Sequence, residues 1–405
     1  MPPGYHDAHT RVESHLICVP GEEESLMSRW IRVSSLMFAV LAVLLLAGSG
    51  SAQAAEAKGK LTVAMVNPLS GDAATYGVSH KNGLELAFQE INKAGGVKGQ
   101  EIELVTHDDA GEPKQAAAGA QKFADQKRVL AITGSCLSSN TLAMVPIIDK
   151  AKLPQTVVSS STPKLSGMSR FFFRMSVQDA QVGILMADLL GQKLKAKKVA
   201  ILYPNNDYGK GLSAAIEAQL KHHGVAVASN QAYLATDKDY SALLTGIKGS
   251  DVDALAVAGT YTDGGLITKQ MRGMGFTKPI VGGTGFYSPK LVEIAGPAAE
   301  GVFLLGPFVA TNPDPAVREF VKKYKEKYGM DPDMFAALAY DQGYVLKAAM
   351  EKAAEKGITR EHVRDAMAAT HYKGITGTVT FDDKGDWVRP YLYITVKDGR
   401  FEVAQ

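Results

Sequence analysis

The residues best suited to bind a small anion form the hydroxyl-rich stretch from Thr133 to Thr141. This stretch follows an apolar run at 129–132, which predicts a buried strand, and precedes a run with helical spacing at 142–152. Free N–H groups and the positive end of the helix dipole gather at a helix start, where Ser138 and Ser139 would add hydroxyl donors. We therefore predict an anion site that needs no basic side chain. An ordinary Ser/Thr helix cap is the alternative.

Motifs for enzyme chemistry are missing from the sequence. No G-x-G-x-x-G follows the first predicted strand, and neither a Walker phosphate loop nor an H-E-x-x-H motif occurs. Asp108 and Asp109 could act as paired carboxylates, but their position before Gly111 is more typical of turn hydrogen bonds. Cys136 has no histidine near it in the sequence, so we interpret it as a small buried residue. These patterns predict a binding protein rather than an enzyme, with no catalytic residue, metal or cofactor.

Composition and charge are those of an ordinary globular protein. The chain has 405 residues, of which 46% are hydrophobic and 21% charged, and this length allows two or three domains. The net charge of +2 is too balanced to indicate a nucleic-acid partner.

The beginning of the chain carries the pattern of an export signal. Arg29 and Arg32 precede an apolar run at 36–47, and small residues then lead to Ala52-Gln53-Ala54. A charged region, an apolar region and an A-x-A site in this order are typical of a cleaved signal peptide. The apolar run is too short for a good membrane span. The pattern therefore predicts cleavage after Ala54 and delivery to the periplasm.

The predicted leader covers residues 1–54, with the signal proper at about 27–54. Residues 1–26 match no targeting segment, and the sequence leaves open whether they are translated. Removal of the leader would take away Cys18, so that Cys136 could form no internal disulfide.

Strand and helix patterns alternate along the rest of the chain, in two series of similar size. The predicted strands of the first series lie at 61–66, 101–105, 129–132 and 155–158, and those of the second at 199–202, 225–232, 254–258 and 279–281. Three further helices, at about 314–329, 334–355 and 359–369, precede a strand-like tail at 377–381 and 391–396. This order predicts an α/β fold with doubly wound parallel sheets.

Aromatic residues recur in the predicted loops at the strand ends of both series. They are Tyr76, Tyr208, Tyr261, Phe286 and Tyr287. Ligands of open α/β sheets bind beyond the carboxyl ends of the strands, and aromatic rings there can enclose an apolar ligand body. A single ring at such a place is more typical of packing, so the prediction of ligand contacts depends on their recurrence in both series.

Several motifs, in order along the chain, carry a resemblance to a known family. They are Pro68-Leu69-Ser70-Gly71 with Ala74-Thr75-Tyr76-Gly77, the run Ile91 to Gly99, Asp108-Asp109 with Pro113 to Ala116, Gly134 to Thr141, Asp207 to Gly211, Ala295-Gly296 with Ala299-Glu300-Gly301, and Phe381-Asp382 with Lys384-Gly385. With these motifs, the chain from Lys60 to about Phe401 resembles the periplasmic branched-chain amino-acid (Leu/Ile/Val) binding proteins, the solute receptors of ABC transporters.

The resemblance implies a type I periplasmic binding protein fold, which has two Rossmann-like lobes and three hinge crossovers. The crossovers should lie near residues 178, 307 and 382. The expected boundaries are 59–178 plus 308–381 for lobe 1, and 179–307 plus 382–405 for lobe 2.

The resemblance also implies that hydroxyl and N–H groups of lobe 1 hold a ligand carboxylate. Ser138 and Ser161 match the side-chain donors, and Ser159 matches a backbone contact. The full set of predicted ligand contacts is Ser138, Ser139, Ser159, Ser161, Tyr76, Tyr208, Tyr261, Thr284, Asp263 and Phe286.

One position departs from the family pattern. Members that bind α-amino acids place an acidic residue of lobe 2 against the ligand ammonium, and the matching residue here is Thr284. A hydroxyl cannot neutralise a buried ammonium, and an unpaired buried ion costs several kcal/mol. Either another carboxylate takes over, with Asp263 as the nearest candidate, or the ligand is an aromatic or aliphatic carboxylate without an amine.

The function that the resemblance implies is ligand capture by hinge closure, followed by docking on an ABC permease in the membrane. The partners would be a small carboxylate or amino acid and the permease, and we expect a monomer. A ligand sensor on the same scaffold is an alternative.

Overall fold

The computed structural model describes residues 59–387 and 389–404. The predicted leader, its cleavage site and Cys18 lie outside the described residues. Within these ranges, no helix combines the length and the apolar character needed to cross a membrane.

Five parallel strands form the sheet of the part that we call the first lobe. Their spatial order is β2-β1-β3-β4-β5. Their bounds are β1 Leu61–Asn67, β2 Ile102–Asp108, β3 Val129–Thr133, β4 Gln155–Val157 and β5 Phe172–Arg174. β1 is buried along its whole length, because helices cover both faces of the sheet.

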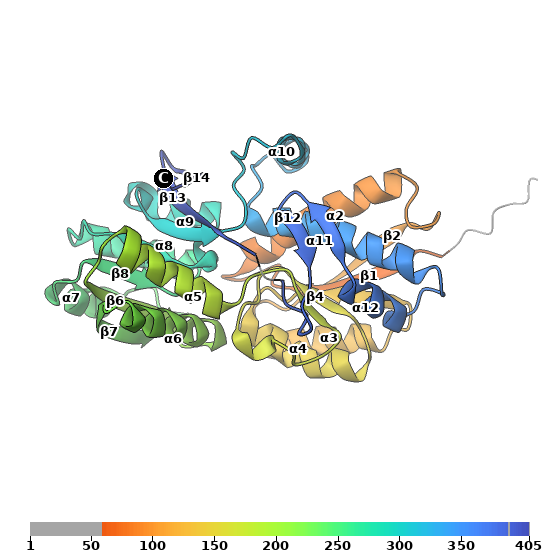
Figure 1. The fold of residues 1–405 in the computed structure, drawn as a ribbon, viewed down its shortest axis with the longest axis horizontal. Helices are drawn as coiled ribbons and strands as arrows, with labels where there is room; N and C mark the ends of the chain where they lie inside the picture. The colour runs from red at the N-terminus through yellow and green to blue at the C-terminus, as the bar shows by residue number, and fades with distance from the viewer. Residues whose placement is uncertain (1–58, 388, 405) are drawn as a thin grey trace, which may run out of the picture. The chain divides into compact units, whose positions relative to one another are not determined.

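Alternate side chains of β1 face different pairs of helices. Val63 and Met65 pack with α2 (Ala74–Lys93) and α11 (Met334–Ala353), whereas Ala64 and Val66 pack with α3 (Pro113–Ala124) and α4 (Ser138–Lys150). Figure 1 shows these two pairs on opposite sides of the strands. Gly83 lets α2 approach α11 closely, since a Cβ there would lie 2.1 Å from the carbonyl oxygen of Ala336.

Seven strands form the sheet of the second lobe, in the order β14-β13-β10-β9-β8-β6-β7. Their bounds are β6 Lys198–Pro204, β7 Ala226–Tyr233, β8 Ala254–Val257, β9 Ile280–Gly282, β10 Phe303–Gly306, β13 Leu392–Lys397 and β14 Arg400–Val403. The strands from β7 to β10 are parallel, while β13 and β14 join the edge antiparallel.

Helices also cover both faces of the second sheet. The helices α5 (Asp179–Asp188) and α6 (Asp207–His222) pack on Val199 and Ile201, and α7 (Ser241–Gly249) and α8 (Tyr261–Gly273) pack on Ala200 and Leu202. The remaining elements are α9 Pro289–Ala295, α10 Pro315–Tyr328, α12 Arg360–Ala368, and the paired strands β11 His371–Gly374 and β12 Gly377–Thr380.

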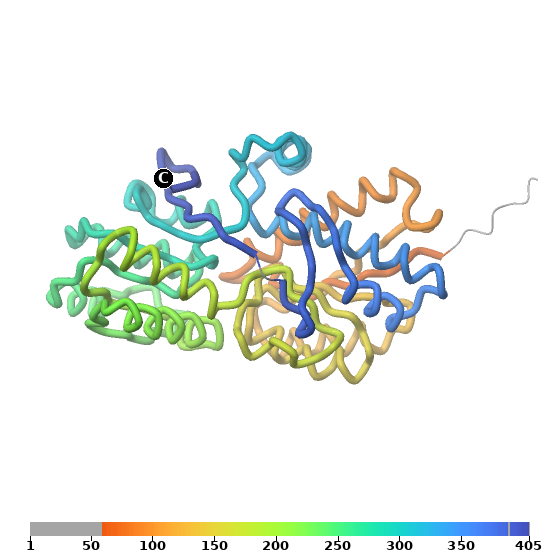
Figure 2. The backbone as a smooth tube through the Cα atoms, viewed as in Figure 1, coloured from red at the N-terminus to blue at the C-terminus, as the bar shows by residue number. Residues whose placement is uncertain are grey.

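The chain passes between the two sheets three times: after β5, after β10 and after β12. Figure 2 shows these passages in the yellow-green, teal and dark-blue parts of the tube. The predicted class, α/β with two doubly wound parallel sheets and three crossovers, is confirmed. The antiparallel edge of the second sheet and the strands β5, β10, β11 and β14 were not predicted, since a run of three or four residues gives only a weak periodic signal. The exact lobe boundaries stay a prediction.

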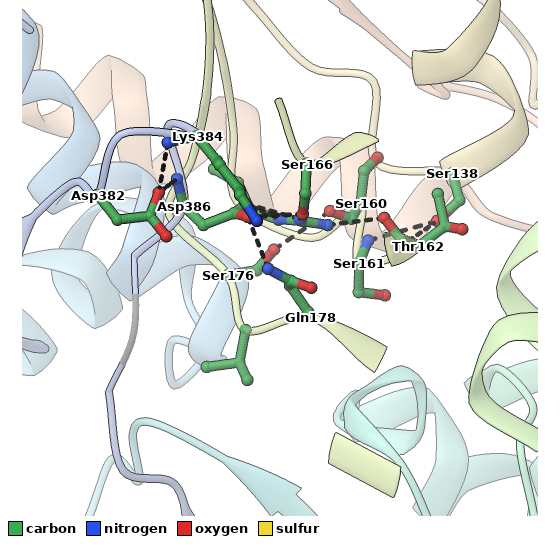
Figure 3. A network of polar contacts seen from close by, with 12 residues as sticks. Ser138, Ser160, Ser161, Thr162, Ser166, Ser176, Gln178, Asp382, Lys384 and Asp386 are labelled. Carbon is green, nitrogen blue, oxygen red and sulfur yellow. Dashed lines mark hydrogen bonds and ion pairs between the residues drawn. The ribbon is translucent and has the colours of Figure 1, made fainter. Parts of the chain in front are cut away.

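A buried ion pair joins the first crossover to the third. The Nη2 atom of Arg174, the last residue of β5, lies 2.6 Å from Oδ1 of Asp386, and the two side chains are 0% and 2% exposed. The neighbouring backbone also pairs, because the N–H of Arg174 donates to Gly385 and that of Trp387 donates to Arg174. Gln178 donates to the other oxygen of Asp386 at 2.6 Å, as Figure 3 shows.

We expect Asp386→Ala to lower the free energy of unfolding by about 3–5 kcal/mol, because it leaves a buried guanidinium without its partner. Urea unfolding followed by circular dichroism measures this loss. The matched control is Glu361→Ala, which breaks the exposed pair with Lys152 and should cost under about 1 kcal/mol. Equal losses in the two variants would contradict a stabilising role for the buried pair.

Candidate functional site

A cavity of about 280 Å³ lies at the carboxyl ends of strands from both sheets. Its volume is close to the lower end of the roughly 300–1,000 Å³ range of small-molecule sites. Among its lining residues in the described chain there is no Asp, Glu, Lys or Arg. These residues are Tyr76, Gly111, Pro113, Cys136, Leu137, Ser138, Ser139, Asn140, Ser159, Asn206, Tyr208, Ala235, Thr260, Thr284, Gly285 and Phe335.

The start of α4 forms one wall of the cavity. The helix begins at Ser138, four residues earlier than predicted, and no side chain caps it. The first-turn N–H groups of Ser138, Ser139 and Asn140 have no acceptor within the helix. The Oγ of Ser138 accepts the N–H groups of Ser161 and Thr162, each at 3.3 Å. Since these bonds use the hydroxyl as an acceptor, its own proton remains available to donate.

The neighbouring hydroxyls donate to acceptors of the protein itself. Ser139 Oγ donates to Asp207 at 2.8 Å, and Ser159 Oγ donates to the carbonyl of Cys136 at 2.9 Å. Thr141 Oγ1 donates to the carbonyl of Ser135 at 3.1 Å. Ser138 therefore differs from Ser139 and Ser159, because its proton has no acceptor among the described residues.

Two predicted aromatic residues line the opposite part of the cavity. The ring of Tyr76 packs edge-on against Tyr261 and Phe335, with centroids 4.7 and 4.8 Å apart. Its hydroxyl donates to the carbonyl of Gly285 in the second lobe. Burial raises the pKa of Tyr76 and of Tyr208, so both phenols stay protonated. These side chains form an apolar surface with polar edges.

Four predicted contacts do not line the cavity: Ser161, Tyr261, Asp263 and Phe286. The N–H of Ser161 donates to the Oγ of Ser138, which does line the cavity. The hydroxyl of Tyr261 donates to the carbonyl of Asp72 at 2.7 Å. Phe286 is fully buried below Gly264 and Gly282 in the second lobe. Their ligand contacts stay predictions.

Asp263 already has a full set of donors. One carboxylate oxygen accepts the N–H and hydroxyl groups of Thr260 and the N–H of Gly264, and the other accepts the hydroxyl of Tyr233. Thr260 and Asp263 form a capping box at the start of α8. The geometry gives Asp263 a structural role, whereas Thr284 does line the cavity.

The pair Asp108 and Asp109 is also structural. Oδ1 of Asp108 accepts the N–H groups of Leu69 and Ala110 at 2.8 Å. Asp109 accepts the N–H of Gly111 at 2.9 Å and the hydroxyl of Ser135 at 2.6 Å. The turn interpretation is therefore confirmed. Among the described residues, no cluster of His, Cys, Asp or Glu has a geometry that could hold a metal ion.

The model of the family described as periplasmic binding protein matches residues 60–400. The chain belongs to the periplasmic binding protein family. A relative from Pseudomonas aeruginosa, named leucine-, isoleucine-, valine-, threonine-, and alanine-binding protein, is 29% identical over 87% of this chain and 92% of its own length. Leu/Ile/Val-binding protein homolog 3 of Brucella melitensis is 30% identical over 83% of this chain and 91% of its own.

A solved structure agrees with the fold of this periplasmic binding protein. It is the branched-chain amino acid transporter substrate-binding protein LivJ of Streptococcus pneumoniae in complex with isoleucine. The TM-score is 0.80 and the identity 32%, over 85% of this chain and 98% of LivJ.

Contacts between the two lobes of this periplasmic binding protein surround the cavity. Asp207 at the start of α6 accepts the hydroxyl of Ser139 and pairs with Lys164 at 2.6 Å. Lys238 pairs with Asp72 at 3.0 Å.

Two residues at the site were not among the predicted ligand contacts. The pattern of polar strand-end loops could have indicated Asp207. No local signal indicates Phe335, because it reaches the cavity from a helix more than 170 residues after Ser138 along the chain.

Cys136 serves as a test of the expectation that the site performs no nucleophilic chemistry. The thiol is 6% exposed at the cavity wall, and burial raises its pKa. Little thiolate is therefore present at neutral pH. In a Cys18→Ser background, we expect a disulfide reagent to label Cys136 at least about a hundredfold more slowly in the folded than in the urea-unfolded protein. Comparable rates would contradict an inert buried thiol.

Proposed function

We propose that this chain is the extracytoplasmic solute-binding protein of an ABC importer, which captures a branched-chain or other apolar amino acid by closure of its two lobes. The observation that carries the proposal is the uncommitted hydroxyl of Ser138 at the start of α4, on the wall of a small cavity with uncharged lining residues. The names of the Pseudomonas and Brucella relatives, and the isoleucine bound to LivJ, support this class of ligand.

The carboxylate of the ligand would bind first, to the first-turn N–H groups of α4 and the hydroxyl of Ser138. Each hydrogen bond to a charged group contributes about 1.5–3 kcal/mol. The apolar side chain would pack on Tyr76, Leu137 and Phe335, which line the same cavity. Closure of the second lobe then brings Tyr208 and Thr284 against the ligand, and exclusion of water strengthens the hydrogen bonds to its carboxylate.

The chain would act in the periplasm and deliver its ligand to a membrane permease, without changing it chemically. Removal of the predicted signal peptide at Ala54 would release it there. Restoration of leucine uptake in a deletion strain distinguishes this transport role from a sensor, which would restore a signalling response but not uptake.

A second candidate ligand is a carboxylate without an amine. Thr284 in place of an acidic residue, and the uncharged lining, favour it. Thermal-shift measurements with leucine, isoleucine and valine, beside the α-keto acid analogue of leucine, test the ligand class. We expect the amino acids to raise the melting temperature by several degrees, since a ligand at 100 times its Kd stabilises by about 2.7 kcal/mol. Stabilisation by the keto acid alone would contradict the amino-acid proposal.

We expect Ser138→Ala to weaken leucine binding about tenfold or more, because it removes one charge-assisted hydrogen bond to the ligand and the two hydrogen bonds that hold the loop at 161–162. Isothermal titration calorimetry measures the affinity. Ser241→Ala is the matched control, since this serine lies on α7 away from the cavity and should leave the affinity unchanged. An unchanged affinity in Ser138→Ala would remove Ser138 from the site.

A further inference from the structure

Asp179, the first residue of α5, is a fully buried carboxyl group. It is 0% exposed, and among the described residues neither of its oxygens has a donor at good hydrogen-bond geometry, although the hydroxyl of Ser161 lies close enough to lower its pKa. Two comparable buried carboxylates do have donors: Asp341 accepts from Ile375 and Thr376, and Asp333 accepts from Ser79 and Ala336. An isolated carboxylate in such a place is costly unless a cation joins it.

The position of Asp179 is next to the anion-binding wall of the cavity. Its N–H donates to the carbonyl of Ser161 at 2.8 Å, and Ser161 in turn donates to Ser138. A Cβ built on Gly211 would lie 3.3 Å from Oδ2 of Asp179, so the carboxyl group also faces the first turns of α6, the helix that carries Tyr208. Figure 3 shows Ser138, Ser161 and Thr162 together, with Gln178, the residue before Asp179, nearby.

The charged and titratable groups that act on Asp179 do not supply a free cation. Arg174 is nearby, but its guanidinium donates to Asp386, Thr162 and Ser166. Tyr208 and Tyr391 also feel the charge of Asp179, and burial raises the pKa of both phenols. Burial raises the pKa of Asp179 itself to about 7, with smaller opposing effects from Ser161 and Arg174.

We infer that Asp179 provides the counter-charge for the ammonium group of the bound amino acid, a role that Thr284 cannot fill. This inference rests on the proposed function. The ammonium and carboxylate of an α-amino acid are attached to one carbon atom, so their binding groups must be neighbours. Asp179 meets this condition through Ser161 and Ser138, whereas the oxygens of Asp263 are occupied by Thr260, Gly264 and Tyr233. Attraction between opposite charges is strong in such a dry environment.

A proton linkage follows from the ionisation of Asp179. Without ligand its pKa is about 7, so the carboxyl group is largely neutral at about pH 6 and largely ionised at about pH 8. The ammonium requires the ionised form and lowers this pKa on binding, so leucine binding releases a proton at the lower pH. Leucine affinity therefore rises from about pH 6 to pH 8, while that of the α-keto acid analogue falls, because an anion is repelled by the ionised carboxylate.

The test combines the variant Asp179→Asn with calorimetry of leucine and its α-keto acid analogue. Asparagine keeps the size of the side chain and removes the charge. At about pH 8 we expect the variant to bind leucine about thirtyfold or more weakly, to bind the keto acid as well as or better than the wild type does, and to lose both pH trends. Asp341→Asn is the control: this carboxylate is equally buried but serves Ile375 and Thr376, so the selectivity for leucine over the keto acid should stay unchanged.

The outcomes separate the inference from the proposed function. Wild-type protein that binds leucine, together with an Asp179→Asn variant of unchanged selectivity, overturns the role of Asp179 alone. Wild-type protein that binds the keto acid but no amino acid overturns the proposed function and the inference together. Should the variant fail to fold, the wild-type pH trends decide: opposite slopes for leucine and the keto acid support the counter-charge, and equal slopes overturn it.

Discussion

The hydroxyl of Ser138 is the point on which the arrangement of the site depends. By accepting the N–H groups of Ser161 and Thr162, it fixes the loop after β4 against the start of α4 and keeps its own proton for a ligand. The carbonyl of Thr162 then accepts from Arg174, which pairs with Asp386 at the third crossover. A continuous set of hydrogen bonds thus joins the cavity to the segments about which the lobes would hinge (Figure 3).

The buried acidic residues near the cavity differ in how their charge is stabilised. Asp263 is held by a local capping box and by Tyr233, so it has little capacity left for a ligand. Asp179 has no donor at good geometry among the described residues, and it lies at the start of α5, where the helix dipole favours a negative charge. If the ligand is an amino acid, as we propose, the uncharged lining residues leave its ammonium without a partner, and Asp179 is the buried acidic residue whose oxygens are least occupied. On this proposal, Thr284 marks a change in where the counter-charge lies.

Local patterns in the sequence predicted much of the fold. The apolar runs of β1, β3, β6 and β8 are buried strands, and the hydroxyl-rich stretch runs from the end of β3 into the first turn of α4, where it lines the cavity. The resemblance supplied the crossovers, which no local pattern could give, because they depend on which strands pair across long stretches of chain.

The contacts that the sequence did not predict join residues that are far apart along the chain. Phe335 lines the cavity from α11, far along the chain from the other lining residues, so no local pattern predicts it. The pattern of strand-end loops indicates Asp207, but not its contact with Ser139 in the other lobe. Asp263 was the nearest candidate carboxylate to Thr284, but the capping box with Thr260 uses its oxygens. No sequence pattern indicated Asp179, since the poor donor geometry around its carboxyl group depends on packing.

The central claim is that uncharged donors at the start of α4 hold the carboxylate of an apolar amino acid. A crystal structure of the leucine complex tests it most directly. The account predicts the ligand carboxylate within about 3 Å of Ser138 Oγ and of the first-turn N–H groups of α4. A leucine whose carboxylate points instead to Thr284, or a leucine bound outside this cavity, would contradict it.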